Sequence, residues 1–284
     1  MHDIGILQLT QHLDDAVRGF KAGLAEGGAD AAFTYRSADG NAALLPALAA
    51  ELAGRGVELI FACSTPAAKA AVELASPIPV VFTPVFDPAG AGLLAAGKAT
   101  GMAGMVPAEA KVAFMRRLLP GARTAGVLYH DSDANAVLEA ENFRAAAAGT
   151  YEIINFAVSR SDHLSTLDER LAVRPDVLFL PIGRVVEENF ATVAYYAELA
   201  GVPVVASSPA NVAAGALGAL AADHYKLGYA CAGQAARILA GADPGSLPVG
   251  RADEPDVFLN AAAARSLGLV LPADLVAIAR EVYE

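Results

Sequence analysis

The sequence predicts an α/β protein made of two lobes, each with a parallel sheet covered by helices. Apolar runs of strand length alternate with segments of helical period, and this alternation stops and then restarts near the middle of the chain. The runs are continuously apolar, which is typical of strands buried on both faces of a parallel sheet. A chain of 284 residues is long enough for two lobes of ordinary size.

Four strands separated by helices open the chain. The strands are expected at IGILQL, AAFTYR, VELIFA and IPVVFT, residues 4–9, 31–36, 57–62 and 78–83. The helices are expected at residues 14–25, 42–53 and 66–74. Strands and helices that alternate in this way build a parallel sheet with helices on both faces.

The second series begins after a helix expected over residues 107–121. Its strands are expected at TAGVLYH, YEIINFAV, DVLFLPI, VPVVAS and GALGALAA, residues 124–130, 151–158, 176–182, 202–207 and 215–222. A long helix follows from about Tyr225 to Leu239. The glycine-rich stretch at residues 97–106 is the candidate for one crossing, and the absence of a low-complexity linker predicts a short hinge.

Composition excludes several classes of protein. The formal net charge is −11, which argues against nucleic acid or an anionic membrane surface as partner. Cys63 and Cys231 lie far apart and outside any metal or redox motif, so both are interpreted as small buried hydrophobic residues.

The amino terminus lacks the pattern of a signal peptide, so the protein either stays in the cytoplasm or has lost a leader.

Small polar residues follow the third predicted strand. Ser64, Thr65, Pro66 and Ala67 open a helix there, with proline suited to the first helical turn. Helix-terminal N–H groups and hydroxyls can hold a carboxylate at this edge of a sheet. The alternative is a simple N-cap, in which Ser64 or Thr65 satisfies the helix itself.

The fourth predicted strand ends with Thr83, Phe86 and Asp87. An aspartate before proline is biased toward extended backbone, so Asp87 is a candidate to meet a cation. A turn-stabilising role for its carboxylate is the alternative.

Strand ends in the second series also carry polar residues. The candidates there are Asn135, Arg184, Ser207, Ser208, Asp223 and Tyr225. Asp133 or Asn135 can instead cap a helix, and Arg184 can instead be a solvated surface residue.

Catalytic and metal motifs are weak. The five histidines show no metal-ligand spacing, and the chain has no G-x-S-x-G, Walker A or G-x-G-x-x-G element. Ser207, His130 and Asp87 offer the residue types of a hydrolase triad, but a chain of this size provides such a set by chance. No catalytic residue, metal or cofactor is therefore expected.

Six blocks of sequence carry a family resemblance that covers nearly the whole chain. They are GILQLTQHLDDAVRGFKAGL, CSTPAAKAA, PIPVVFTPVFDPAGAGLL, LLPGARTAGVLYHDSDAN, the run from GVPVVASSPAN to DPGSLPV, and FLNAAAARSLGLVLP. Their order and spacing resemble ABC-transporter substrate-binding proteins of the tryptophan/tyrosine-binding type. The resemblance implies a type I periplasmic-binding-protein fold, in which two Rossmann-like lobes joined by a multi-crossing hinge close on a small solute.

The resemblance also assigns residues. The ATPAA loop of the family matches Ser64 to Ala68, its TDP turn matches Phe86 to Pro88, and Asn135 falls where the family commonly has asparagine. Its D-Y-Y stretch matches Asp223 to Tyr225, with histidine in the middle.

Two departures concern lobe two. Where relatives often read PTDN this chain reads Pro181 to Arg184, and where they often read ASD it reads Ala206 to Ser208. An arginine and a serine in place of acidic or amide groups favour a ligand with more negative charge.

The resemblance implies a division into lobes, partners and a location. Lobe one is expected to comprise residues 1–105 and a return segment at about 225–252, lobe two residues 106–224, and the lobe of residues 253–284 is left open. The implied function is extracytoplasmic, periplasmic or lipid-anchored: binding of a small amino acid or an aromatic or carboxylate solute, then delivery to an ABC permease in the membrane. A cytoplasmic ligand-sensing regulator is the alternative, and an α/β enzyme is the third hypothesis.

Overall fold

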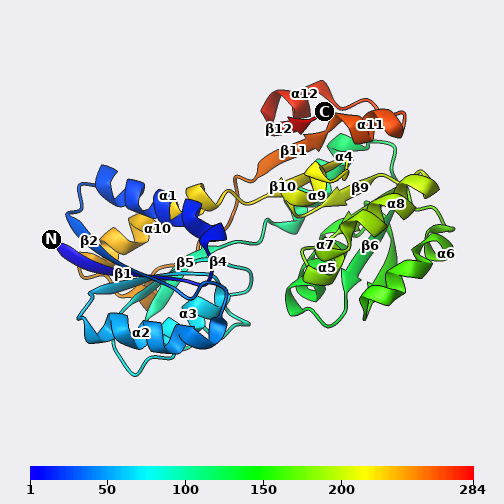
Figure 1. The fold of residues 1–284 in the computed structure, drawn as a ribbon. Helices are drawn as coiled ribbons and strands as arrows, with labels where there is room; N and C mark the ends of the chain where they lie inside the picture. Colours follow the sequence, from blue (N-terminus) through cyan, green and yellow to red (C-terminus); the bar gives the residue numbers. More distant parts are fainter. The chain divides into compact units, whose positions relative to one another are not determined.

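The computed structural model describes the backbone of residues 1–284 and all side chains except those of His12, Ser161 and Asp162. The chain forms two compact units, drawn in Figure 1. Unit 1 comprises Met1–Met105 and Ala222–Glu254, and unit 2 comprises Val106–Ala221 and Pro255–Glu284. The return to unit 1 starts at Ala222, three residues before the expected boundary, and the C-terminal segment clusters with unit 2.

Unit 1 contains a five-stranded parallel sheet in the order β2-β1-β3-β4-β5. Its strands are β1 (His2–Gln8), β2 (Ala31–Ser37), β3 (Leu59–Cys63), β4 (Val80–Val85) and β5 (Ala99–Ala103). Residues 97–106 were the candidate for one crossing, and the chain does pass from unit 1 to unit 2 within them, between Met105 and Val106. Half of that stretch is not linker but the strand β5. Gly101 permits the pairing, because an added Cβ would lie 2.1 Å from the Phe82 carbonyl oxygen on β4.

Helices cover both faces of the unit 1 sheet. α1 (Asp14–Glu26) and α10 (His224–Leu239) lie on one face, and α2 (Leu45–Gly54) and α3 (Thr65–Val72) on the other (Figure 1). Phe20 of α1 stacks on Phe61 of β3 with ring centroids 4.0 Å apart. Short 3₁₀ helices span Gln11–Leu13, Ala42–Leu44 and Pro244–Ser246. Both faces of the inner strands β3 and β4 are thus buried, as their continuous apolar character predicts, whereas the edge strand β2 is only partly buried.

Unit 2 contains a seven-stranded sheet in the order β12-β11-β10-β9-β8-β6-β7. Its strands are β6 (Thr124–His130), β7 (Glu152–Val158), β8 (Val177–Leu180), β9 (Val204–Ala206), β10 (Gly218–Ala221), β11 (Asp256–Asn260) and β12 (Ala279–Tyr283). The sheet is parallel except where β10 pairs with β11. The C-terminal strands β11 and β12 were not predicted.

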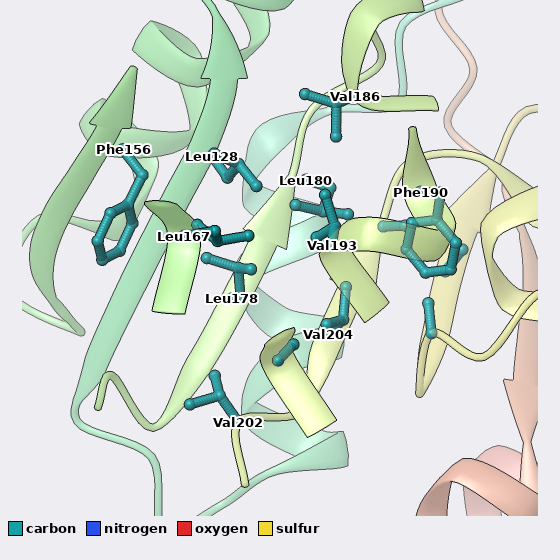
Figure 2. Close-up of a cluster of buried hydrophobic side chains, with 14 of the residues drawn as sticks. Leu128, Phe156, Leu167, Leu178, Leu180, Val186, Phe190, Val193, Val202 and Val204 are labelled. Carbon is teal, nitrogen blue, oxygen red and sulfur yellow. The ribbon is translucent and has the colours of Figure 1, made fainter. Parts of the chain in front are cut away.

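The helices of unit 2 surround a large apolar core. They are α4 (Ala108–Leu118), α5 (Ala134–Ala147), α6 (Leu167–Leu171), α7 (Arg184–Glu188), α8 (Phe190–Ala200), α9 (Pro209–Ala213), α11 (Ala261–Ser266), α12 (Ala273–Ile278) and a 3₁₀ helix at Ser161–Thr166. Figure 2 shows Val186 of α7 and Phe190 and Val193 of α8 gathered over the side chains of β8 and β9. Val186 therefore fixes the short helix α7 directly beyond the carboxyl end of β8.

Among the described residues, no helix has both the length and the apolar character that crossing a bilayer requires.

Candidate functional site

The unit 1 sheet changes its direction of growth between β1 and β3. β1 lies between β2 and β3, and such a switch point leaves a crevice beyond the carboxyl ends of the two central strands. Gln8 ends β1 opposite Cys63 of β3. The Gln8 side chain is buried, donates to Asp14 Oδ1 at 3.1 Å and accepts from the Tyr35 hydroxyl at 2.7 Å. Sequence reasoning missed Gln8, although it is the polar residue within an apolar strand.

The helix that follows β3 begins at this crevice. Ser64 Oγ accepts from the backbone N–H of Ala67 at 3.3 Å, and the Ser64 carbonyl accepts from Ala68 at 3.0 Å. Pro66 has no N–H to offer. The N-cap alternative was therefore right for Ser64, and Thr65 is the residue whose backbone N–H and hydroxyl are not used by the cap.

The residues predicted on and after β4 have different surroundings. Thr83 lies within the sheet, with its hydroxyl fully buried near the Cys231 thiol and without a partner of hydrogen-bond geometry among the described residues. Phe86 is half-buried. The Asp87 carboxylate accepts from the backbone N–H of Gly90 at 2.8 Å, as expected of a turn-stabilising aspartate.

A cavity of about 550 Å³ in unit 1 contains Asp223 and Tyr225. The Asp223 carboxylate caps α10 through the backbone N–H groups of Tyr225, at 2.8 Å, and Lys226, at 3.2 Å. The Tyr225 ring is 38% exposed and lies against Tyr229, with centroids 6.5 Å apart. Met102 and Arg251, which sequence reasoning missed, also line this cavity.

The unit 2 sheet has its own switch point, between β6 and β8. Asp133 caps α5 after β6, accepting from Asn135 at 3.0 Å, and the Asn135 side chain is exposed. After β8, the Arg184 side chain is 79% exposed and lies 3.8 Å from Glu188 one turn later in α7. Burial raises the pKa of the Glu187 carboxyl on the same helix. Exposed ion pairs such as Arg184–Glu188 contribute little to the free energy of folding. The Arg184 guanidinium can therefore reorient at little cost.

Ser207 follows β9 and is bonded to charged groups that sequence reasoning missed. Its hydroxyl donates to Glu139 Oε1 at 2.5 Å and accepts from Lys111 Nζ at 3.2 Å. Lys111 and Glu139 themselves form a buried ion pair. Ser208 is the N-cap residue of α9, without a capping bond from its side chain.

The described residues do not form the triad weighed from the sequence. The Ser207 hydroxyl is bonded to Glu139, and His130 Nε2 lies 3.3 Å from the Ser159 carbonyl oxygen. Among the side chains that the structure describes, no three acidic, histidine or cysteine groups are placed to hold a metal ion. His12, one of the five histidines, lies outside the described side chains.

Comparison with known proteins adds a family and relatives. The family described as ABC transporter substrate binding protein matches residues 3–283. The chain is 28% identical to the tyrosine-binding protein of Clostridioides difficile (strain R20291) over 270 residues, 91% of this chain and 78% of the relative. Two examples of solved structures resemble this chain. One is the ligand-free, open structure of a substrate-binding protein with adhesive properties from Clostridium difficile. Its TM-score is 0.90 at 26% identity, and the match covers 100% of this chain and 99% of that chain. The other is an ABC domain in complex with L-Trp from Streptococcus pneumoniae, with TM-score 0.77, 26% identity and 99% of both chains covered.

Proposed function

Because the chain belongs to the family of ABC transporter substrate-binding proteins, we propose that it binds a small carboxylate-bearing solute, with an aromatic amino acid as the first candidate. The family membership confirms the sequence resemblance. The similarity to solved substrate-binding proteins confirms the type I periplasmic-binding-protein fold. It also confirms a solute-binding role and excludes the enzyme hypothesis.

The observation that carries the ligand class is the start of α3. Thr65 presents a hydroxyl and a backbone N–H at the unit 1 switch point, while Ser64 supplies the cap. A carboxylate placed there gains two donors and the favourable end of the helix dipole. Phe86, half-buried after β4, is the candidate apolar wall.

Relatives supply the candidate for the rest of the ligand. One is a tyrosine-binding protein, and another was solved with L-Trp. Arg184 and Ser208 depart from the family pattern in unit 2. The Arg184 guanidinium can match a carboxylate as a planar fork of donors. The remaining predicted contacts are Pro66, Ala67, Thr83, Asp87, Asn135, Ser207, Asp223 and Tyr225.

The proposal includes a partner and a location. An ABC permease in the membrane is the expected recipient of the solute, in the periplasm or at the outer face of a membrane. A full-length gene with a leader or lipobox, beside permease and ATPase genes, would support this location over a cytoplasmic sensor.

The proposal is tested by thermal shift and calorimetry with four matched compounds. They are L-tyrosine, L-tryptophan, tyramine, which lacks the carboxylate of tyrosine, and 3-(4-hydroxyphenyl)propionate, which lacks its ammonium. We expect the carboxylates to stabilise the protein, by about 2.7 kcal/mol at 100 times the dissociation constant. Tyramine should have no effect.

Each compound distinguishes one part of the proposal. Equal stabilisation by tyramine and L-tyrosine would eliminate the carboxylate contact. Tighter binding of the propionate than of L-tyrosine would support the more negative ligand that Arg184 favours. No shift with any compound at millimolar concentration would overturn the aromatic ligand class.

A further inference from the structure

Unit 2 contains an ion pair that is almost completely removed from water. Lys111 of α4 is 5% exposed and Glu139 of α5 is 2% exposed, and their side chains are in direct contact. Burial lowers the pKa of the Lys111 ammonium to about 7, a cost that its contacts with Glu139 and Ser207 must offset. Replacing a buried ion pair by apolar residues is often neutral or stabilising, so stability alone does not explain this one.

The carboxylate of this pair also holds two loops. Glu139 Oε2 accepts from the backbone N–H of Ile182 at 2.7 Å, and Oε1 accepts from the Ser207 hydroxyl at 2.5 Å. Ile182 follows β8 and Ser207 follows β9, which are neighbours in the sheet. One buried side chain therefore fixes the carboxyl ends of two adjacent strands.

These loops carry the groups of unit 2 that differ from the family pattern. Ile182 lies two residues before Arg184, and Ser207 directly precedes Ser208, the N-cap residue of α9. Binding groups that are fixed beforehand do not have to be ordered when the ligand arrives, so affinity is higher.

We propose that Glu139 is a positioning residue, which Lys111 holds in place and which fixes the loops after β8 and β9 for ligand binding. The inference rests on the proposed function, because those loops are expected to supply the contacts of unit 2 with the solute. Neither Lys111 nor Glu139 needs to touch the ligand.

The test uses double variants, because Lys111→Met alone would leave a buried charge without its partner and could unfold the protein. K111M/E139M replaces the pair by apolar side chains of similar size. K111M/E139Q keeps a side-chain oxygen that can accept from Ile182 or Ser207. Asp176→Asn is the matched control, since Asp176 accepts from the N–H groups of Arg123 and Thr124 at 2.8 Å, at the opposite end of the same sheet.

Affinity for L-tyrosine is measured by calorimetry on the full chain, alongside urea unfolding. We expect at least a tenfold loss of affinity in K111M/E139M, a smaller loss in K111M/E139Q, and parental affinity in Asp176→Asn despite its lower stability. Parental affinity in K111M/E139M would overturn the inference.

Hydrogen exchange without ligand gives a second, independent readout. Peptides that cover residues 181–184 and 206–209 should exchange faster in K111M/E139M, while β1 in unit 1 stays unchanged. If the parent does not bind L-tyrosine, the proposed ligand is wrong but the exchange comparison still decides the positioning role. Unchanged exchange at both loops would overturn it.

Discussion

Ser64 and Thr65 are neighbours at the start of α3, yet their hydroxyls have different surroundings. Ser64 caps the helix and adopts φ 98°, a region that is strained for a residue with a Cβ. Its backbone N–H donates to the Thr83 carbonyl at 3.1 Å, which ties the strained residue to β4. Ser64 thus has the structural role, and Thr65 is the residue for which we propose the contact with the carboxylate.

Thr65→Val separates ligand binding from helix capping. We expect affinity for L-tyrosine to fall by roughly 1–3 kcal/mol, since a bound carboxylate would lose one donor. The free energy of unfolding should change less, because the cap is intact. Calorimetry and urea unfolding measure the two quantities.

Ser64→Ala is the comparison for that variant. Loss of the cap should lower the free energy of unfolding by about 0.5–2 kcal/mol. If Thr65→Val instead loses stability while its affinity is parental, the carboxylate contact at Thr65 is wrong.

Hydrogen bonds between residues close in the sequence were predictable, and the buried ion pair between distant residues was not. Asp87 accepts from Gly90, three residues along the chain, so the turn-stabilising role that the sequence offered is confirmed, while its contact with a ligand stays a prediction. Lys111 and Glu139 are partners across 28 residues, which no local pattern reveals. The available signal was a charge on the apolar face of each helix, since Lys111 is spaced with Phe114 and Met115.

At the scale of elements, α1 and α10 approach each other unusually closely. A Cβ added to Gly19 of α1 would lie 2.0 Å from the Tyr225 carbonyl oxygen, and one added to Gly228 of α10 would lie 1.9 Å from the Ala16 carbonyl oxygen. Glycines on both helices therefore let the backbones meet. This contact joins the returning segment, which carries Asp223 and Tyr225, to the first part of unit 1.

Gly228→Ala tests this packing. The added methyl must push the helices apart, and overpacking of this kind typically costs about 1–3 kcal/mol of unfolding free energy. Gly233→Ala on the same helix is the matched control, because nothing lies within 4 Å of its added Cβ.

Gly233→Ala should stabilise by roughly 0.5–1 kcal/mol through helix propensity. Urea unfolding compares the three proteins. Equal stabilities of Gly228→Ala and Gly233→Ala would contradict the close-packing account.

Most elements followed from apolar periodicity, and two of the missed strands, β5 and β12, have a physical reason for the weak signal in their sequence. β6 spans the residues that were predicted, whereas β5 is short and glycine-containing and β12 carries charged residues. Edge strands such as these are stabilised by pairing with a neighbour, so their own sequence carries little strand signal. The points at which each sheet reverses its direction of growth were also not predictable, because they depend on the order of the strands in the sheet, which the strand pattern of a single sequence does not reveal.

At the scale of the whole molecule, the chain passes between the units three times, after Met105, Ala221 and Glu254. Three connections restrict the relative motion of the two units more than a single linker does, because the backbone of every connection must change conformation when the units move. Hinges of this kind concentrate the motion in a few residues and leave each sheet rigid. Preorganisation of the loops of unit 2 by Glu139 therefore remains compatible with a moving hinge.

Ligand binding is expected to make the protein more compact in solution. The contacts proposed for the solute belong to both units, Thr65 to unit 1 and the β8 and β9 loops to unit 2. A ligand shifts a conformational population by its differential affinity for the states. We expect small-angle scattering to show a smaller radius of gyration with saturating L-tyrosine, and no change with tyramine. Thr65→Val at the same L-tyrosine concentration should show a partial change, in proportion to its occupancy. A scattering curve that stays the same while calorimetry reports full occupancy would mean that one unit alone binds the solute, and closure would have to be abandoned as the mechanism.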